Sequence, residues 1–177
     1  ESQDRVTIIN TATGKIEGHF KGVGSPKGIT QTGPGATGLS PMLFVTNFGQ
    51  GTVTGIPLNA VQPGIAICDA VNALNDDISS RVFVNVGRNP NGIAADFFGN
   101  AIVMVANQGD NEVTVFDPQS LSQVSGGLTE TFQVGESPSE VVWTQPTQIG
   151  LFAWIVNQGG VNDPDGGDSP LAALPGG

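Results

Sequence analysis

Three stretches of this chain are variants of one sequence, and this repetition limits the fold more than any other feature. Each copy opens with a Val-Gly pair shortly before a proline, at 23–30, 86–96 and 134–144. Each copy then continues into an apolar segment that ends in asparagine, and Asn47, Asn107 and Asn157 lie 60 and 50 residues apart. A period of about 50 residues is typical of arrays of small β-sheets. The repeat therefore predicts one small sheet for each copy.

The middle copy gives the order of strands within a sheet. Its segment "AIVMVAN" is almost continuously apolar, as expected for a strand buried on both faces. An N-x-G turn follows, in which we expect Gly109 to supply a positive φ and the preceding asparagine to fix the geometry. The next segment, "EVTVFD", alternates, with Val113 and Val115 on one side and Thr114 and Phe116 on the other. With a short first strand and an outer strand added, each copy predicts a four-stranded antiparallel meander, the blade of a β-propeller.

The segment 86–124 resembles the YVTN family of β-propeller repeats. The likeness covers the V-G-x-x-P opening, the V-x-N tripeptide and the "VTVFD" strand. The first copy has "FVTN" at 44–47 and the third has "WIVN" at 154–157. The resemblance implies an all-β propeller and an exported protein, since such proteins are mostly surface-layer or secreted propellers. It also implies a likeness to lactonase-type propellers and to the propeller subunits of quinoprotein and cytochrome-linked dehydrogenases.

The two ends of the chain each match only part of a blade. Residues 5–22 match the last two strands, and residues 134–160 match the first two. We therefore divide the chain into a closing half-blade at 5–22, blades at 23–85 and 86–133, a half-blade at 134–160 and an acidic Gly/Pro-rich tail at 161–177. This makes about three blades, whereas closed propellers typically have about 4–8. The expectation is an incomplete ring or arc, completed by further residues, by a second chain or by a protein partner. Within the first blade, residues 57–80 predict a surface excursion with a short helix at 69–74.

Charge and composition exclude several classes of partner. The net charge is −10, from 16 acidic and 6 basic residues, so a phosphate backbone or an anionic membrane surface would be repelled. The sequence has no apolar run long enough to span a membrane. Cys68 is the only cysteine, which rules out an internal disulfide. The chain begins with Glu1, as expected for a mature chain after signal removal or for a cut fragment. We expect a periplasmic, extracellular or cell-surface location.

Side chains able to support chemistry are few. Asp163, Asp165 and Asp168 could offer carboxylates to Ca²⁺, but the surrounding spacing lacks the glutamate of an EF-type loop, and a solvated acidic tail is favoured. His19 is the single histidine and lies on a predicted outer strand, away from a propeller's central channel. The predicted inner strands offer only Asp96 and Glu140 as acidic residues. No catalytic residue set and no cofactor site is predicted.

Two classes of function follow. The first is a non-catalytic exported binding or scaffold subunit that needs a protein partner or further propeller blades. The second is a propeller subunit or fragment of a periplasmic enzyme, lactonase-like or linked to a quinoprotein or cytochrome. The sequence favours the first, because the inner strands carry too few ionisable residues for a convincing metal or catalytic site.

Overall fold

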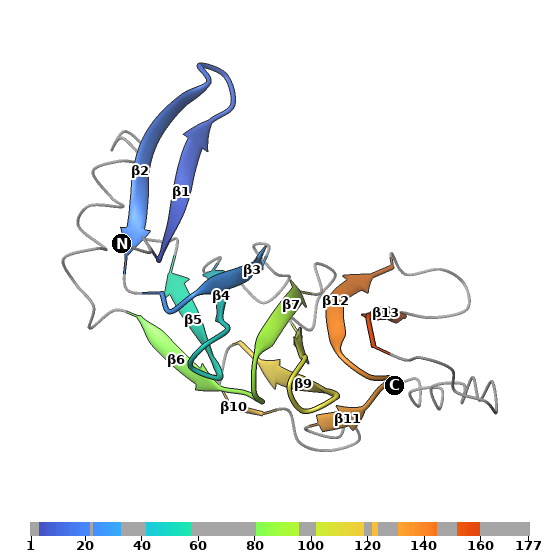
Figure 1. The fold of residues 1–177 in the computed structure, drawn as a ribbon. Helices are drawn as coiled ribbons and strands as arrows, with labels where there is room; N and C mark the ends of the chain where they lie inside the picture. Colours follow the sequence, from blue (N-terminus) through green and yellow to red (C-terminus); the bar gives the residue numbers. More distant parts are fainter. Residues whose placement is uncertain are drawn as a thin grey trace.

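The computed structural model describes residues 4–21, 23–32, 42–57, 81–95, 102–118, 122–123, 131–144 and 152–159. Those residues form thirteen strands and no helix, so the described chain is all-β. The strands are arranged in antiparallel sheets that follow one another along the chain (Figure 1). The predicted fold class is therefore confirmed: the chain is an array of propeller-like blades that does not close into a ring.

The first complete blade is built from β3 (Pro26–Gln31), β4 (Met42–Asn47), β5 (Thr52–Pro57) and β6 (Val82–Asn85). They pair in the order β3-β4-β5-β6, which is the predicted meander. The two central strands are buried on both faces, because neighbouring layers cover each side. Such strands do not alternate between apolar and polar residues, as strands with one solvent-exposed face do.

The second complete blade contains β7 (Pro90–Ala95), β8 (Val103–Asn107) and β9 (Glu112–Asp117). Its fourth place is split, because both β10 (Ser122–Gln123) and β11 (Thr131–Gln133) pair with β9. β10 pairs with one end of β9 and β11 with the other. The single outer strand that the sequence predicted is thus divided into two short pieces.

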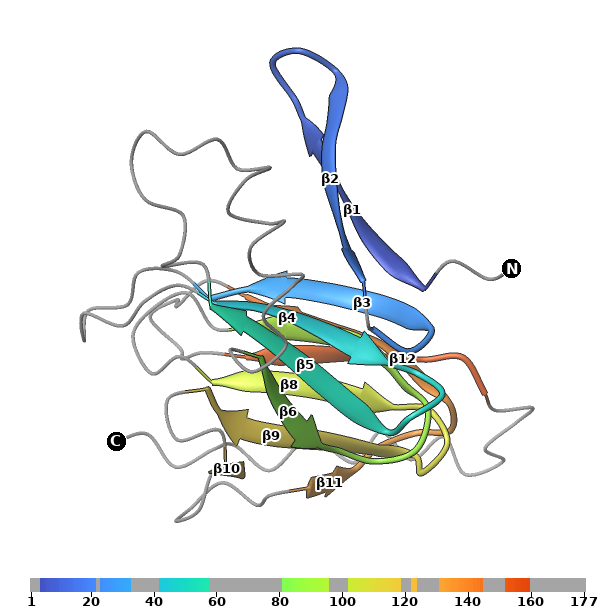
Figure 2. The same ribbon diagram turned by 90° about the vertical axis from the view of Figure 1, so that its left-hand side faces the viewer.

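A two-stranded hairpin stands at each end of the array. The first hairpin consists of β1 (Arg5–Asn10) and β2 (Lys15–Lys21), and the last of β12 (Pro138–Trp143) and β13 (Ala153–Asn157). Figure 2 shows the stacked sheets side by side, with the first hairpin standing away from them. The two hairpins lie at opposite ends of the molecule in Figure 1.

Apolar side chains fill the layers between successive sheets. The layer between the two blades contains Phe44, Val53, Ile93, Val105 and Phe116, with the rings of Phe44 and Phe116 edge to face at 5.6 Å. The layer between the second blade and the last hairpin is formed by Met104, Ala106, Val113, Val115 and Val141. The sides predicted for β9 are therefore correct, since Val113 and Val115 face the last hairpin and Phe116 faces the first blade. A third, smaller cluster joins the first hairpin to the first blade; it contains Val6, Ile8, Phe20, Leu43 and Ile56.

Two glycines let the inner strands approach each other closely. A Cβ on Gly92 of β7 would lie 2.5 Å from both Glu140 Cα and Ser139 O of β12. A Cβ on Gly28 of β3 would likewise overlap the backbone of β7. Backbone can move aside only if a whole strand moves. The inner strands β3, β7 and β12 can therefore lie this close together only because glycine has no side chain at these two positions.

The turn after β8 differs from the prediction in one respect. Gly109 does not have a positive φ; in this part of the blade the positive φ falls on Gly51 at 64° and on its counterpart Asn111 at 58°. Gly109 is needed for space instead, because a Cβ there would lie 2.9 Å from Arg88 Cβ. The prediction assigned the left-handed position two residues too early, since the turn is longer than the N-x-G tripeptide.

Some predictions fall on residues outside those that the structure describes. They are the short helix at 69–74 with the surrounding excursion, and the acidic tail at 161–177. Among the described residues, no helix has the length and apolar character needed to cross a membrane.

Candidate functional site

The strand-ending asparagines are structural in both complete blades. Asn47 Nδ2 donates to Thr54 Oγ1 at 2.8 Å and to Thr52 Oγ1 at 2.9 Å. Asn107 Nδ2 donates to Thr114 Oγ1 at 2.6 Å in the same way. Both side chains are buried, and a threonine hydroxyl of the next strand accepts from each amide nitrogen. Asn47 Oδ1 accepts from the Gly24 N–H at 3.2 Å, whereas Asn107 Oδ1 has no hydrogen-bond partner among the described residues. The predicted structural role is correct, although the partner is a threonine across the sheet and not the asparagine's own turn.

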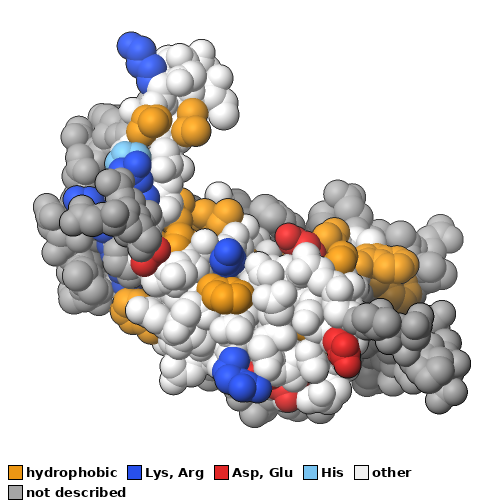
Figure 3. All heavy atoms as spheres, in the orientation of Figure 1, with side chains coloured by type: hydrophobic (Ala, Val, Ile, Leu, Met, Phe, Trp, Pro, Cys, Tyr) orange, Lys and Arg blue, Asp and Glu red, His pale blue; other side chains and the backbone are white. Residues whose placement is uncertain are grey.

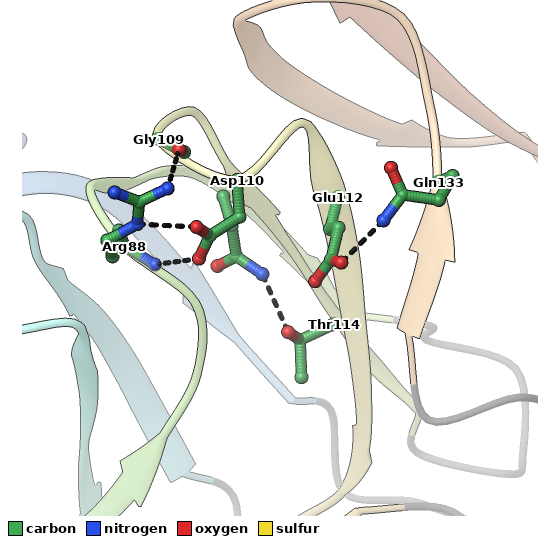
Figure 4. A network of polar contacts seen from close by, with 7 residues as sticks. Arg88, Gly109, Asp110, Glu112, Thr114 and Gln133 are labelled. Atoms are coloured by element: carbon green, nitrogen blue, oxygen red, sulfur yellow. Dashed lines mark hydrogen bonds and ion pairs between the residues drawn. The ribbon is translucent and has the colours of Figure 1, made fainter.

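A polar network covers the turn of the second blade (Figure 4). Arg88 Nε lies 2.6 Å from Asp110 Oδ1, and the Arg88 backbone N–H donates to Asp110 Oδ2 at 2.6 Å. Arg88 also donates to Gly109 O at 2.8 Å. The backbone and side-chain hydrogen bonds from Arg88 lower the pKa of Asp110. The sequence did not indicate this pair; the spacing that marks it is an aspartate three residues after Asn107.

The last hairpin has an uncovered apolar face. Val142, Phe152, Trp154 and Val156 are exposed, with Trp154 at 62%. Val142 pairs with Trp154 and Glu140 with Val156, so these side chains lie on one face of the hairpin. The opposite face packs on the second blade. Figure 3 shows hydrophobic side chains gathered over β12 and β13. We call Glu140, Val142, Phe152, Trp154 and Val156 the trailing face.

The inner strand of the first blade has a matching uncovered face. Ile29 is 52% exposed, whereas its counterparts Ile93 and Val141 are 7% and 4% exposed. These three residues are equivalent because each follows the repeat's proline by three positions. Ile93 and Val141 are covered by the sheet that precedes them, and Ile29 is not. We call Lys27, Ile29 and Gln31, all exposed in β3, the leading face.

The residues that the sequence singled out for chemistry are not brought together. Asp163, Asp165, Asp168 and Asp96 lie outside the described residues, so the calcium site stays a prediction. Glu140 is exposed on β12. His19 lies in β2, where its Nδ1 is 3.1 Å from Thr7 Oγ1. Within the described residues, no group of three or more His, Cys, Asp or Glu could hold a metal ion.

Comparison with known proteins supports the fold. Hydrazine synthase of Kuenenia stuttgartiensis is similar over 90% of this chain, with a TM-score of 0.60 and 19% identity. A streptogramin B lyase structure matches 78% of the chain, with a TM-score of 0.48 and 13% identity. The chain has a β-propeller fold. It spans 38% of the length of each of these two chains.

No family model matches the sequence, and no curated protein matches it. The likeness to YVTN repeats therefore stays a prediction about the sequence family.

The sequence predicts that an open array exposes a sheet face at each end, but it did not identify the residues that form the two faces. A signal for them exists in the repeat itself. The glycine that touches the next sheet in two copies, Gly28 and Gly92, is replaced by Glu140 in the third. A charged side chain at a position otherwise reserved for backbone contact marks a face with a different neighbour.

Proposed function

We propose that this chain is a non-catalytic, exported binding or scaffold subunit whose propeller is completed by further blades or by a protein partner. The observation that carries the proposal is the uncovered apolar face of the last hairpin, together with the exposed Ile29 on the inner strand at the other end of the array. Large apolar patches on soluble proteins usually mark interaction sites. Covering the exposed half of Ile29, which is 52% exposed, contributes about 1 kcal/mol, or half of what burial of a whole isoleucine side chain contributes.

The geometry of the blades supports an interface of a definite kind. Each internal face of the array meets a neighbouring sheet through interdigitating apolar side chains and close backbone contact. The leading and trailing faces are continuations of those surfaces. A neighbour that fits them is another sheet of the same type, and a flat surface of another kind would leave part of the apolar area wet.

The composition favours an exported scaffold over an enzyme. The net charge of −10 disfavours nucleic acid and anionic lipid. Of the two acidic residues predicted on inner strands, Glu140 belongs to the trailing face, so we assign it to the interface and not to catalysis. The proposal therefore includes an exported location and a role without catalysis.

Size-exclusion chromatography and cell fractionation of native extracts, with an antibody against this chain, test the proposal. We expect the chain outside the cytoplasm and in a particle well above 18.1 kDa. A chain that elutes as a free monomer from the cytoplasmic fraction would contradict both parts.

Charge substitution tests whether the faces are used. Ile29→Glu and Trp154→Glu should release the chain from the particle, because each places a carboxylate in an apolar layer. Thr131→Glu is the matched control, since Thr131 is exposed on the outer strand β11, away from both faces. Equal particle size for all three variants would exclude the two faces from the assembly.

A further inference from the structure

The two end hairpins are the missing halves of one blade. Counted along the repeat, β12 and β13 correspond to β7 and β8, the first two strands of a blade. In the same way β1 corresponds to β9, because "RVTIIN" at 5–10 aligns with "EVTVFD" at 112–117. The packing agrees, since Val6 and Ile8 of β1 face the following sheet, as Val113 and Val115 of β9 do.

A buried polar pair is divided between these hairpins. Both complete blades hold an asparagine at the end of the second strand and a threonine in the third, joined at 2.8 Å and 2.6 Å. In the end hairpins the corresponding residues are Asn157 and Thr7. Asn157 is exposed, whereas Asn47 and Asn107 are fully buried. Each hairpin therefore carries one member of a pair that the complete blades bury.

The uncovered faces correspond in the same way. Between the second blade and the last hairpin, Met104 and Ala94 pack against Val141 and Trp143. The same repeat positions at the open ends are Trp154 and Val142 on the trailing face and Ile29 and Gln31 on the leading face. On the trailing face, Trp154 stands where the second blade has the smaller Met104. On the leading face, Gln31 stands where the last hairpin has the larger Trp143. The two faces are thus complementary in size.

Charge also matches across the two faces. Between the second blade and the last hairpin, Gly92 lies close to Ser139 and Glu140. At the open ends, the residue in the place of Gly92 is Glu140. The residues in the places of Ser139 and Glu140 are Lys27 and Gly28. The side chains of Glu140 and Lys27 are both exposed. Joining the faces brings a carboxylate to the strand that carries an ammonium group. The extra volume of Glu140 and Trp154 requires this joint to be wider than the glycine joints.

We propose that two copies of this chain exchange half-blades, with β13 of each copy pairing with β1 of the other, to form a closed six-bladed ring. The part of the 177-residue chain that the structure describes holds two complete blades and two half-blades, which make three blade equivalents, so two copies of it make six. Six lies within the range of about 4–8 blades of closed propellers, and three lies below it. This inference rests on the proposed role in assembly and names a second copy as the partner.

The register of the exchanged pair follows from the complete blades. Ala106 pairs with Val113 in the second blade, and Thr46 pairs with Val53 in the first. The corresponding pair is Val156 of one copy and Val6 of the other. Directly opposite residues in an antiparallel pair are about 4.5–5.5 Å apart at Cα, a separation that a disulfide can bridge.

Oxidative cross-linking tests this register. In a Cys68→Ser background, V6C together with V156C should give a covalent dimer that runs on a non-reducing gel with no longer species. V6C together with I155C is the control, because a shift of one residue places the second thiol on the other face of the sheet. A ladder of higher species would show open head-to-tail polymers and would overturn the ring. Equal cross-linking of both pairs, or none for the first pair, would overturn the register.

Mass and a matched substitution test the partner. Sedimentation velocity of the 177-residue chain should give twice 18.1 kDa, and a monomer at all concentrations would overturn the proposal. Thr7→Val should raise the dimer dissociation constant about 30- to 25,000-fold, because it leaves an Asn157 amide buried without a partner at each of the two seams, at about 1–3 kcal/mol each. His19→Ala removes the Thr7–His19 contact but keeps the Thr7 hydroxyl, and it should leave the constant unchanged.

The two proposals can fail separately. If the isolated chain is monomeric and the native particle contains a different polypeptide, exchange between two copies is wrong and the scaffold role stands. If the chain is monomeric both in isolation and in native extracts, both are wrong.

Discussion

At the scale of single residues, the blade depends on one amide and one hydroxyl. Asn107 and Thr114 are fully buried, and the amide donates to the hydroxyl at 2.6 Å. Thr114→Val keeps the shape but removes the acceptor, so we expect the free energy of unfolding to fall by about 1–3 kcal/mol. Urea denaturation followed by tryptophan fluorescence measures the change. Thr131→Val, at an exposed position of the neighbouring strand β11, should have little effect; equal losses for both variants would contradict the role of the buried pair.

Asp110 gives stability a defined pH dependence. Hydrogen bonds from Arg88 lower the pKa of Asp110 in the folded state, so its contribution is present above the pKa of the unfolded chain, at about 3.9. The contribution is lost as pH falls through the lowered folded value. Because Arg88 is mostly exposed, the ion pair itself is worth at most about 1 kcal/mol. Melting temperatures of the wild type and Asp110→Asn should differ at pH 7 and converge at acid pH. A difference that persists at low pH would contradict this assignment.

At the scale of strands, the spacing between blades is set by glycine. Gly92→Ala would place a Cβ 2.5 Å from two backbone atoms of β12, so the strands must separate. Overpacking of this kind costs about 1–3 kcal/mol. Gly49→Ala is the matched control, because its Cβ would only make an ordinary contact with Ser25 Oγ at 3.8 Å. Chemical denaturation compares the two variants. A loss no greater for Gly92→Ala than for Gly49→Ala would contradict the close approach.

Burial also predicts an order of local stability among the strands. β8 is buried along its whole length, whereas β1 alternates between exposed and half-buried residues. Amide protons of β8 should therefore exchange more slowly than those of β1 in the monomeric chain. Hydrogen exchange read by mass spectrometry measures both. Similar protection in a monomeric sample would show that the first hairpin is held more firmly than its packing indicates.

The strands could be predicted from the sequence because the repeat fixes them three times over. The spacing of Asn47, Asn107 and Asn157 located the second strand of each copy, and the apolar run at 102–107 correctly predicted burial on both faces. The turn was misread at Gly109, because a positive φ depends on the length of the whole turn. The Arg88–Asp110 pair was missed because the two residues belong to different turns, which only the folded sheet brings together. The blade count predicts an exposed sheet face at each end of an open array, but which residues form these faces depends on packing between sheets, and strand patterns do not contain that information.

At the scale of the whole molecule, net charge opposes assembly between copies. Each chain carries −10, so two copies repel each other at long range. At physiological ionic strength, salt screens charges that are more than about 8–10 Å apart, so this repulsion weakens. The free energy gained by burying apolar side chains does not depend on this screening. The dimer dissociation constant should therefore fall as NaCl rises from low to physiological concentration. Sedimentation at several ionic strengths measures it. A constant that rises with salt would show that attraction between Glu140 and Lys27, and not burial of the apolar side chains, dominates the joint.

Glu140 also has a consequence for the shape of the central opening. Two of the joints along each chain bring backbone against backbone, and glycine fixes their width. The joint that carries Glu140 must be wider by the thickness of a side chain. A six-bladed ring with two such joints would have twofold and not sixfold symmetry, and its central channel would be an oval whose long axis runs perpendicular to the line that joins the two seams.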